Sequence, residues 1–161
     1  MSVALLFELM AKGNGGELKV SSHPANQRGA SSNEVAGIDV FEADGEPLRH
    51  CAEAKDKPFT RPDVDHAASK VAEAGHSRLI SIYGPNAKAG MELEAVVAEY
   101  EEKGFDLTFV SAPAFAQGIV SLAPSVTWAE VVELINKHLA MTRAKEMTIQ
   151  HCKEVIEKVS V

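Results

Sequence analysis

The sequence contains no apolar run near the roughly 18 residues that a membrane-spanning helix needs, so we expect no membrane segment. Its first ten residues are apolar, but they include Glu8 and lack the basic cluster that begins a secretory signal. Two cysteines, Cys51 and Cys152, are too few for a disulfide framework. These absences predict a reduced protein of the cytoplasm.

Basic residues are scarce relative to acidic ones. The chain has 16 lysines and arginines against 23 aspartates and glutamates, which gives a formal net charge of -7. Proteins that coat nucleic acids generically are basic, and the charge argues against that class. A metal-dependent nuclease is still compatible with it, because a metal ion neutralises the carboxylates of such a site.

The length of 161 residues predicts a single domain, residues 1–161, that can bury a core without disulfides or structural metals. We find no internal repeat, low-complexity tract or interdomain linker. The hydrophobic content of 45% is ordinary for a globular protein.

Hydrophobic periodicity and turn residues predict the order α-β-β-β-α-β-α-β-α. The expected helices cover residues 3–12, 63–73, 89–103 and 128–159, the last as one long helix or as two broken near Met141 and Thr142. The expected strands cover residues 18–21, 35–42, 47–55, 78–83 and 105–110, with a hairpin turn at 43–46. This order predicts an α/β fold in which helices flank a mixed sheet.

Charged side chains gather at one end of the predicted hairpin. Glu53 and Lys55 point the same way, because strand residues alternate between faces. The opposite face is assigned Leu48, His50, Ala52 and Ala54. Since the hairpin strands are antiparallel, Asp39 should lie near the start of its strand and close to Glu53.

This arrangement has the groups that a metal-dependent hydrolase needs. Two neighbouring carboxylates repel each other unless a cation lies between them. Mg²⁺, or Mn²⁺ in its place, accepts a few carboxylates together with waters. Lys55 could then orient the attacking water or stabilise the transition state. The plain alternative is a solvated strand end, because an acid-x-Lys triplet is common.

The same residues resemble the PD-(D/E)xK nuclease superfamily, which has the restriction-endonuclease-like fold. That core has the order α-β-β-β-α-β, with an acid on the second strand and (D/E)xK on the third. Asp39, Glu53 and Lys55 match these positions, while Ile38 replaces the proline that names the motif. The core would span about residues 3–84, and residues 85–161 would be an elaboration with a C-terminal helical extension. Gly37–Val40, Glu53–Phe59, Asp63-Val64 and His66-Ala67 also resemble SacI-type restriction endonucleases.

The resemblance implies a metal-dependent endodeoxyribonuclease, as part of a restriction system. It makes Asp39, Glu53 and Lys55 the catalytic residues, with Asp39 and Glu53 binding Mg²⁺ or Mn²⁺. The superfamily often carries a further acid on its first helix. Glu8 is the candidate for that metal ligand, and a solvated helical glutamate is the alternative.

DNA is the partner that this function requires. Gln27, Arg28, Lys57 and Arg61 are candidates for contacts with its backbone or bases, against the alternative of polar or charged loops in solvent. The apolar stripe from Val131 to Val159 is longer than one core needs, and a homodimer contact there is a second candidate partnership.

Two rival interpretations stay open. The first is a non-catalytic DNA-binding or assembly module on the same fold. The second is an unrelated α/β domain that binds a small ligand near residues 84–90, although this loop lacks the Gly-Lys-Ser/Thr ending of a P-loop. The spacing of histidines and cysteines matches no closed zinc site.

Overall fold

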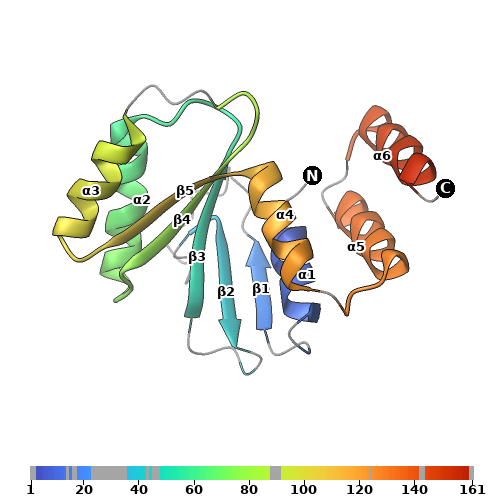
Figure 1. Ribbon diagram of the computed structural model, residues 1–161, viewed down its shortest axis with the longest axis horizontal. Coiled ribbons are helices and arrows are strands. Elements are labelled where there is room, and N and C mark those ends of the chain that lie inside the picture. Colours follow the sequence, from blue (N-terminus) through green and yellow to red (C-terminus); the bar gives the residue numbers. More distant parts are fainter. Residues whose placement is uncertain are drawn as a thin grey trace.

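The computed structural model describes residues 3–13, 15, 18–22, 36–42, 44, 48–87, 92–123, 125–141 and 144–159. Over these residues, six helices flank one five-stranded sheet (Figure 1). The elements in chain order are α1 (Val3–Gly13), β1 (Leu18–Ser22), β2 (Ile38–Glu42), β3 (Leu48–Lys55), α2 (Arg61–Glu73), β4 (Arg78–Tyr83), α3 (Leu93–Glu102), β5 (Asp106–Ser111), α4 (Ala112–Leu122), α5 (Trp128–Met141) and α6 (Glu146–Val159).

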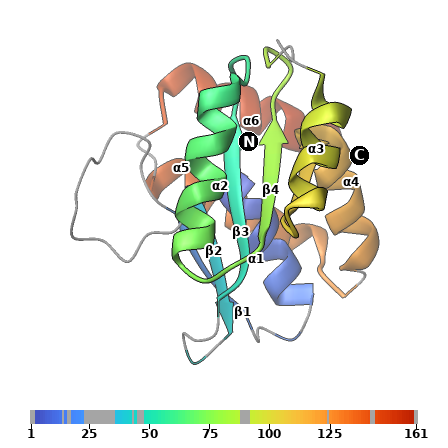
Figure 2. The same cartoon turned by 90° about the vertical axis from the view of Figure 1, so that its left-hand side faces the viewer.

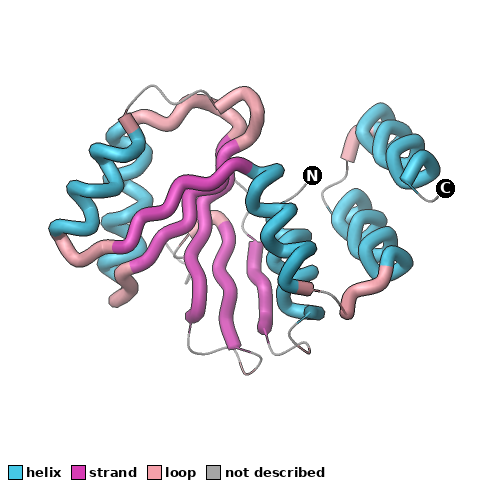
Figure 3. Tube along the Cα trace, in the orientation of Figure 1, coloured by secondary structure: helices cyan, strands magenta, loops and turns pink. Residues whose placement is uncertain are grey.

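The sheet is mixed, as the sequence predicts. Its strands lie in the order β1-β2-β3-β4-β5. The first three strands pair antiparallel, while β3, β4 and β5 run parallel. Parallel neighbours need a crossover connection, which α2 and α3 supply here. Figure 3 shows the sheet between two groups of helices.

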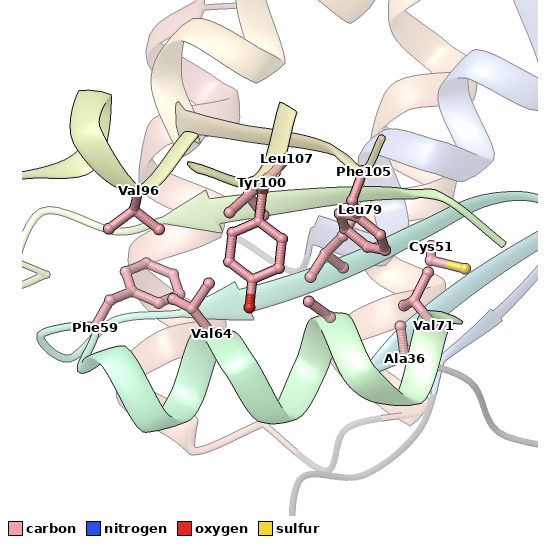
Figure 4. Close-up of a cluster of buried hydrophobic side chains, with 11 residues drawn as sticks. Ala36, Cys51, Phe59, Val64, Val71, Leu79, Val96, Tyr100, Phe105 and Leu107 are labelled. Carbon is pink, nitrogen blue, oxygen red and sulfur yellow. The ribbon is translucent and has the colours of Figure 1, made fainter. Parts of the chain in front are cut away.

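One face of the sheet is covered by α2 and α3 (Figures 1 and 2). Their apolar side chains pack on inward residues of β3, β4 and β5 (Figure 4). The buried members of this cluster are Ala36, Cys51, Phe59, Val64, Ala68, Val71, Leu79, Val96, Tyr100, Phe105 and Leu107. Because the hydrophobic effect scales with the apolar area removed from water, this layer fixes α2 against the sheet.

The opposite face is covered by α1 and α4. Ala4 and Phe7 of α1 pack with Ile38 and Val40 of β2, and Phe115 of α4 joins them. A third cluster then attaches α5 to the outer side of α1 and α4, through Leu5, Leu6, Leu9, Ile119 and Leu134. By contrast, α6 buries none of its residues and lies beyond α5, away from α2 and α3 (Figure 1).

The helices differ from the predicted ones at some boundaries and by one additional helix. The second helix begins at Arg61, two residues early, because Thr60 and Asp63 form a capping box and Pro62 is tolerated in the first turn. The helix α4 was not predicted, since Pro113 and Gly118 obscure its pattern. Pro113 lies in its first turn, where the missing N–H has no helical partner to lose.

The C-terminal region forms two helices instead of one, with the break after Met141, where the second alternative placed it. A capping box formed by Thr127 and Glu130 starts this region. The Thr127 amide donates to Glu130 Oε2 at 2.8 Å, and the Glu130 amide donates to Thr127 Oγ1 at 3.4 Å.

The predicted facing of Leu48 is wrong. The register pairs Val40 with His50 but Phe41 with Leu48, so β3 bulges at Arg49. An extra residue reverses the alternation of side chains. Leu48 therefore packs with the cluster under α2 and α3, on the same face as Cys51 and opposite to His50.

No helix in the described part of the chain is long and apolar enough to cross a membrane.

Candidate active site

The two predicted carboxylates lie on neighbouring strands, on the sheet face covered by α2. Asp39 pairs with Cys51, and Ala52 pairs with Ile38, so Glu53 follows diagonally from Asp39. Diagonal neighbours on one face have Cα atoms about 7–8 Å apart, within reach of long side chains. Asp39 is completely buried, while Glu53 is half-buried.

Two consecutive backbone amides hold these carboxylates. The Ala36 amide donates to Asp39 Oδ1 at 3.0 Å, and the Gly37 amide donates to Glu53 Oε1 at 3.2 Å. A Cβ atom at Gly37 would lie 3.3 Å from Glu53 Oε2, which is tighter than usual contact. Glycine therefore lets the Glu53 carboxylate lie against the backbone.

Lys55, the last residue of β3, is held between an acid and an aromatic ring. Its Nζ lies 2.8 Å from Asp63 Oδ1 in the first turn of α2. The same Nζ lies 5.6 Å from the ring centre of Phe59, within cation–π range. The hydrogen bond from Lys55, with those from Thr60, holds the pKa of Asp63 well below its usual range. Asp63 is therefore ionised at neutral pH.

An open pocket of about 460 Å³ lies beside these groups. Its lining comes from the end of β3 and the first turns of α2, and consists of Glu53, Lys55, Pro62, Asp63, His66 and Ala67. A strand-borne acid and lysine thus face one solvent-accessible space, which is where a substrate would meet them.

Cys51 pairs with Asp39 across the hairpin, and its thiol is unreactive. Burial, and then the charge of Asp39, raise the pKa of its thiol to about 12. Because the thiolate is the reactive form of cysteine, Cys51 is not a nucleophile at neutral pH. Its side chain instead belongs to the core under α2.

Asp56, the residue after Lys55, holds the loop that follows β4. It accepts hydrogen bonds from the Asn86 amide at 3.0 Å and from Asn86 Nδ2 at 2.8 Å, which lower its pKa. A Cβ atom at Gly84 would collide with the Asp56 carboxylate. The Gly84 amide also donates to the Lys55 carbonyl at 2.9 Å. The small-ligand interpretation concerned this loop, and its residues 88–90 lie outside the described residues.

Glu8 lies away from the two carboxylates. It belongs to α1, which packs on the other face of the sheet. Its Oε2 lies 2.8 Å from Lys137 Nζ, and its Oε1 lies 3.2 Å from His138 Nε2, both on α5. The structure gives Glu8 a place between α1 and α5 and not beside Asp39.

The predicted DNA contacts fall into three groups. Gln27 and Arg28 lie outside the described residues. Lys57 is exposed, two residues beyond Lys55. Arg61 is engaged in ion pairs, with its Nη1 2.6 Å from Glu99 Oε2 and its Nε 2.7 Å from Asp65 Oδ1. The Arg61 guanidinium thus fastens α2 to α3.

Among the described residues, no three or more His, Cys, Asp and Glu side chains are grouped to hold a metal ion. Asp39 and Glu53 still fit Mg²⁺ chemically, because that ion is usually bound by one or two carboxylates with waters and substrate phosphates completing its shell. The two carboxylates lie on one face of the sheet, where Glu53 lines the pocket and Asp39 is fully buried and does not line it.

Comparison with known families finds a match over the first half of the chain. The family described as SacI restriction endonuclease C-terminal domain matches residues 1–85, more than half of the 161 residues. The chain belongs to the SacI restriction endonuclease C-terminal domain family. No curated protein matches the chain.

The matched SacI-family region contains Asp39 and all of the residues that line the pocket. It runs from α1 to the end of β4 and therefore includes Asp39, Glu53, Lys55, Asp63 and His66. The predicted relationship to restriction endonucleases is thus confirmed at the level of the family. Membership of the PD-(D/E)xK superfamily stays a prediction.

Sequence reasoning did not assign Asp63 and His66 to the site. Both line the pocket beside Lys55. Their spacing of three residues was a usable signal, because it puts two side chains on one face of a helix. The strand and the following helix are joined by only five residues, which brings that face close to the strand end.

Proposed function

We propose that this domain is a Mg²⁺-dependent endodeoxyribonuclease that hydrolyses DNA phosphodiester bonds in a restriction system. Asp39 and Glu53 bind the metal, with Mn²⁺ as a substitute, and Lys55 assists the attack of water. The observation that carries this proposal is the placing of an acid and a lysine, Glu53 and Lys55, in one open pocket within the SacI-family region.

The charge of the chain agrees with a metal-dependent reaction. A net charge of -7 repels a polyanion unless the carboxylates at the point of contact are neutralised. A divalent cation on Asp39 and Glu53 would do this locally. Lys55 and Lys57 then supply positive charge beside the pocket, for the scissile phosphate and its neighbour.

The chemistry proposed is a hydrolysis without redox change. A water oxygen attacks phosphorus and forms a new P–O bond, and one P–O ester bond breaks. The water gives up a proton, and the leaving oxygen receives one. When bound, Mg²⁺ would supply Lewis acidity and charge neutralisation. Lys55, held at 2.8 Å by Asp63, directs its ammonium group to the charge that develops on the phosphate.

The test compares two neighbouring lysines in a plasmid-cleavage assay. With Mg²⁺ present, the wild-type chain should nick or cut supercoiled DNA. Lys55→Ala should reduce the rate by at least about a hundredfold, as expected for losing one group that stabilises transition-state charge. Lys57→Ala is the matched control, because it removes an equal charge from an exposed position two residues away. Its loss should appear as weaker DNA binding, with a far smaller fall in the rate at saturating DNA than in Lys55→Ala.

Chelation gives a second control, and EDTA should stop the reaction completely. Cleavage that continues in EDTA, or that falls equally in the two lysine variants, would contradict the proposal. The non-catalytic alternative predicts a different result. In that case the wild-type chain binds DNA, with affinity that falls steeply as salt rises, and leaves the plasmid intact with either metal.

A further inference from the structure

We propose that Asp63 is a positioning residue of the same site, which fixes the Lys55 ammonium at the pocket and so sets the rate of turnover. This inference rests on the proposed nuclease function. It assigns Asp63 a role beyond capping α2, and the two roles belong to different oxygen atoms of one carboxylate.

The two oxygen atoms of the Asp63 carboxylate make different contacts. Asp63 Oδ2 serves the helix cap, where it accepts from the Thr60 amide at 3.1 Å and from Thr60 Oγ1 at 2.8 Å. Asp63 Oδ1 lies 2.8 Å from Lys55 Nζ. The backbone amide of Thr60, which an alanine at this position keeps, holds the carboxylate on the helix, and the held carboxylate then fixes the lysine.

The surroundings make this pair more than a surface contact. The side chains of Lys55 and Asp63 are only 19% and 27% exposed. Phe59 lies against the ammonium, and its ring is buried and packs edge-on against Phe109 at 5.5 Å. A buried aromatic ring and a carboxylate held by the helix cap thus restrict the conformations that the Lys55 side chain can adopt.

Helix α2 contributes to this site even though Glu53 and Lys55 belong to β3. A free lysine has a large rotamer entropy, so a strand alone would leave its ammonium spread over many positions. Holding a catalytic group in place reduces the entropy lost on reaching the transition state. Asp63 is part of α2, which is packed against the sheet through its apolar residues. The position of Asp63 is therefore fixed, and its contact with Lys55 fixes the ammonium group in turn.

Thr60 offers a matched control. Thr60→Ala removes the side-chain half of the cap and leaves Oδ1 of Asp63 facing Lys55. Asp63→Asn keeps an oxygen that can serve the cap but removes the charge that pairs with Lys55. Both variants weaken the start of α2, and only the second one releases the lysine.

The first measurement needs no catalysis. Reductive methylation labels lysine amines, and the rate at each site is read by mass spectrometry, with exposed Lys57 as internal reference. Relative to Lys57, Lys55 should label about threefold faster in Asp63→Asn than in the wild type, because an ion pair protects its amine. Thr60→Ala should leave this ratio unchanged.

The second measurement is Mg²⁺-dependent cleavage, with kcat and KM determined separately. Asp63→Asn should lower kcat by about tenfold or more with a smaller change in KM, the expected effect of a misplaced catalytic group. Thr60→Ala should keep the wild-type kcat even where its melting temperature falls as far. Asp63→Glu, which restores the charge, should recover part of the lost rate.

The outcomes separate this inference from the nuclease proposal. An unchanged labelling ratio in Asp63→Asn, or equal losses of kcat in Asp63→Asn and Thr60→Ala, would overturn the positioning role. If the wild-type chain cuts no DNA while Asp63→Asn still exposes Lys55, the nuclease function fails and the control of Lys55 by Asp63 is supported.

Discussion

Glycine at position 37 is the residue whose smallness matters most to the candidate site. Its amide donates to Glu53 Oε1, and a Cβ atom there would lie 3.3 Å from Glu53 Oε2, so that oxygen would have to shift slightly. A methyl group there has to displace either the carboxylate or the backbone. The acid is the more mobile of the two, so under the proposed function the effect should fall on binding of the proposed metal before it falls on folding.

Gly37→Ala should therefore raise the Mg²⁺ concentration needed for half-maximal cleavage, by about tenfold to a hundredfold. The melting temperature should change little, because the Glu53 side chain is half-buried and can rotate toward the pocket. Titration of the cleavage rate with Mg²⁺ checks this. A large loss of stability with unchanged metal dependence would show that Gly37 serves the fold alone.

The residue scale also shows what periodicity can and cannot predict. Strand alternation placed Glu53 and Lys55 on one face, and hairpin pairing placed Asp39 close to Glu53. In the structure Asp39 pairs with Cys51 and lies on that face, in a register set by the bulge at Arg49, which was not predicted. The ion pair of Lys55 with Asp63 depends on how far α2 reaches over the strand end. That distance is set by packing, which no local pattern contains.

At the scale of elements, helix caps decide several boundaries. Thr127 and Glu130 have the usual residues of a capping box. In the equivalent pair Thr60 and Asp63, Asp replaces the usual Glu or Gln, and the predicted start of α2 was two residues late. The unpredicted helix α4 has its own cap, with the Ala114 amide donating to Ser111 Oγ at 3.3 Å. A hydroxyl followed by an early proline is thus a helix start in two places in this chain.

The ends of α1 and α4 meet without spare room. A Cβ atom at Gly13 would lie 2.6 Å from the Cβ of Ala123, closer than real contacts allow. Gly13→Ala should therefore destabilise the protein by about 1–3 kcal/mol, the usual cost of overpacking. Denaturant unfolding measures the change.

Two variants control that prediction. Ala123→Gly in the same chain should recover part of the loss, because it removes the opposing methyl group. Gly118→Ala, in the middle of α4, has open space around its added carbon and should be neutral or stabilising. Equal losses in Gly13→Ala and Gly118→Ala would contradict the steric explanation.

At the scale of the whole molecule, structural support weakens toward the C-terminus. The helix α5 is tied to α1 by Leu134 and by the contacts of Glu8 with Lys137 and His138. No residue of α6 is buried, and Met147, Val155 and Val159 are exposed. The last helix therefore contributes little to the core.

Removing residues 146–161 should accordingly lower the melting temperature by less than about 2 °C at low protein concentration. Leu134→Ala, in α5, should cost about 2–5 kcal/mol, because it leaves a cavity between packed helices. Thermal unfolding of both variants checks the contrast. A loss in the truncated chain that grows with protein concentration would instead support the predicted homodimer through the C-terminal helices.

The whole-molecule prediction from sequence was correct in class and incomplete in detail. A mixed sheet with flanking helices follows from the hairpin and the alternation of strands and helices, and it is what the structure has. The sorting of helices onto two faces was not predicted. It depends on which apolar stripes meet, such as Phe7 with Val40 and Val71 with Leu79, and those pairs are distant in sequence.

The bulge at Arg49 divides β3 into two segments. Even-numbered residues face α2 before the bulge, and odd-numbered residues face α2 after it. On the turn side Leu48 faces inward, and on the site side Cys51 and Glu53 do. Phe41 pairs with Leu48, and its neighbour Val40 pairs with His50. A chain without Arg49 could therefore keep both of these pairs with β2. Loss of this one residue would therefore leave the pairing of Asp39 with Cys51 unchanged.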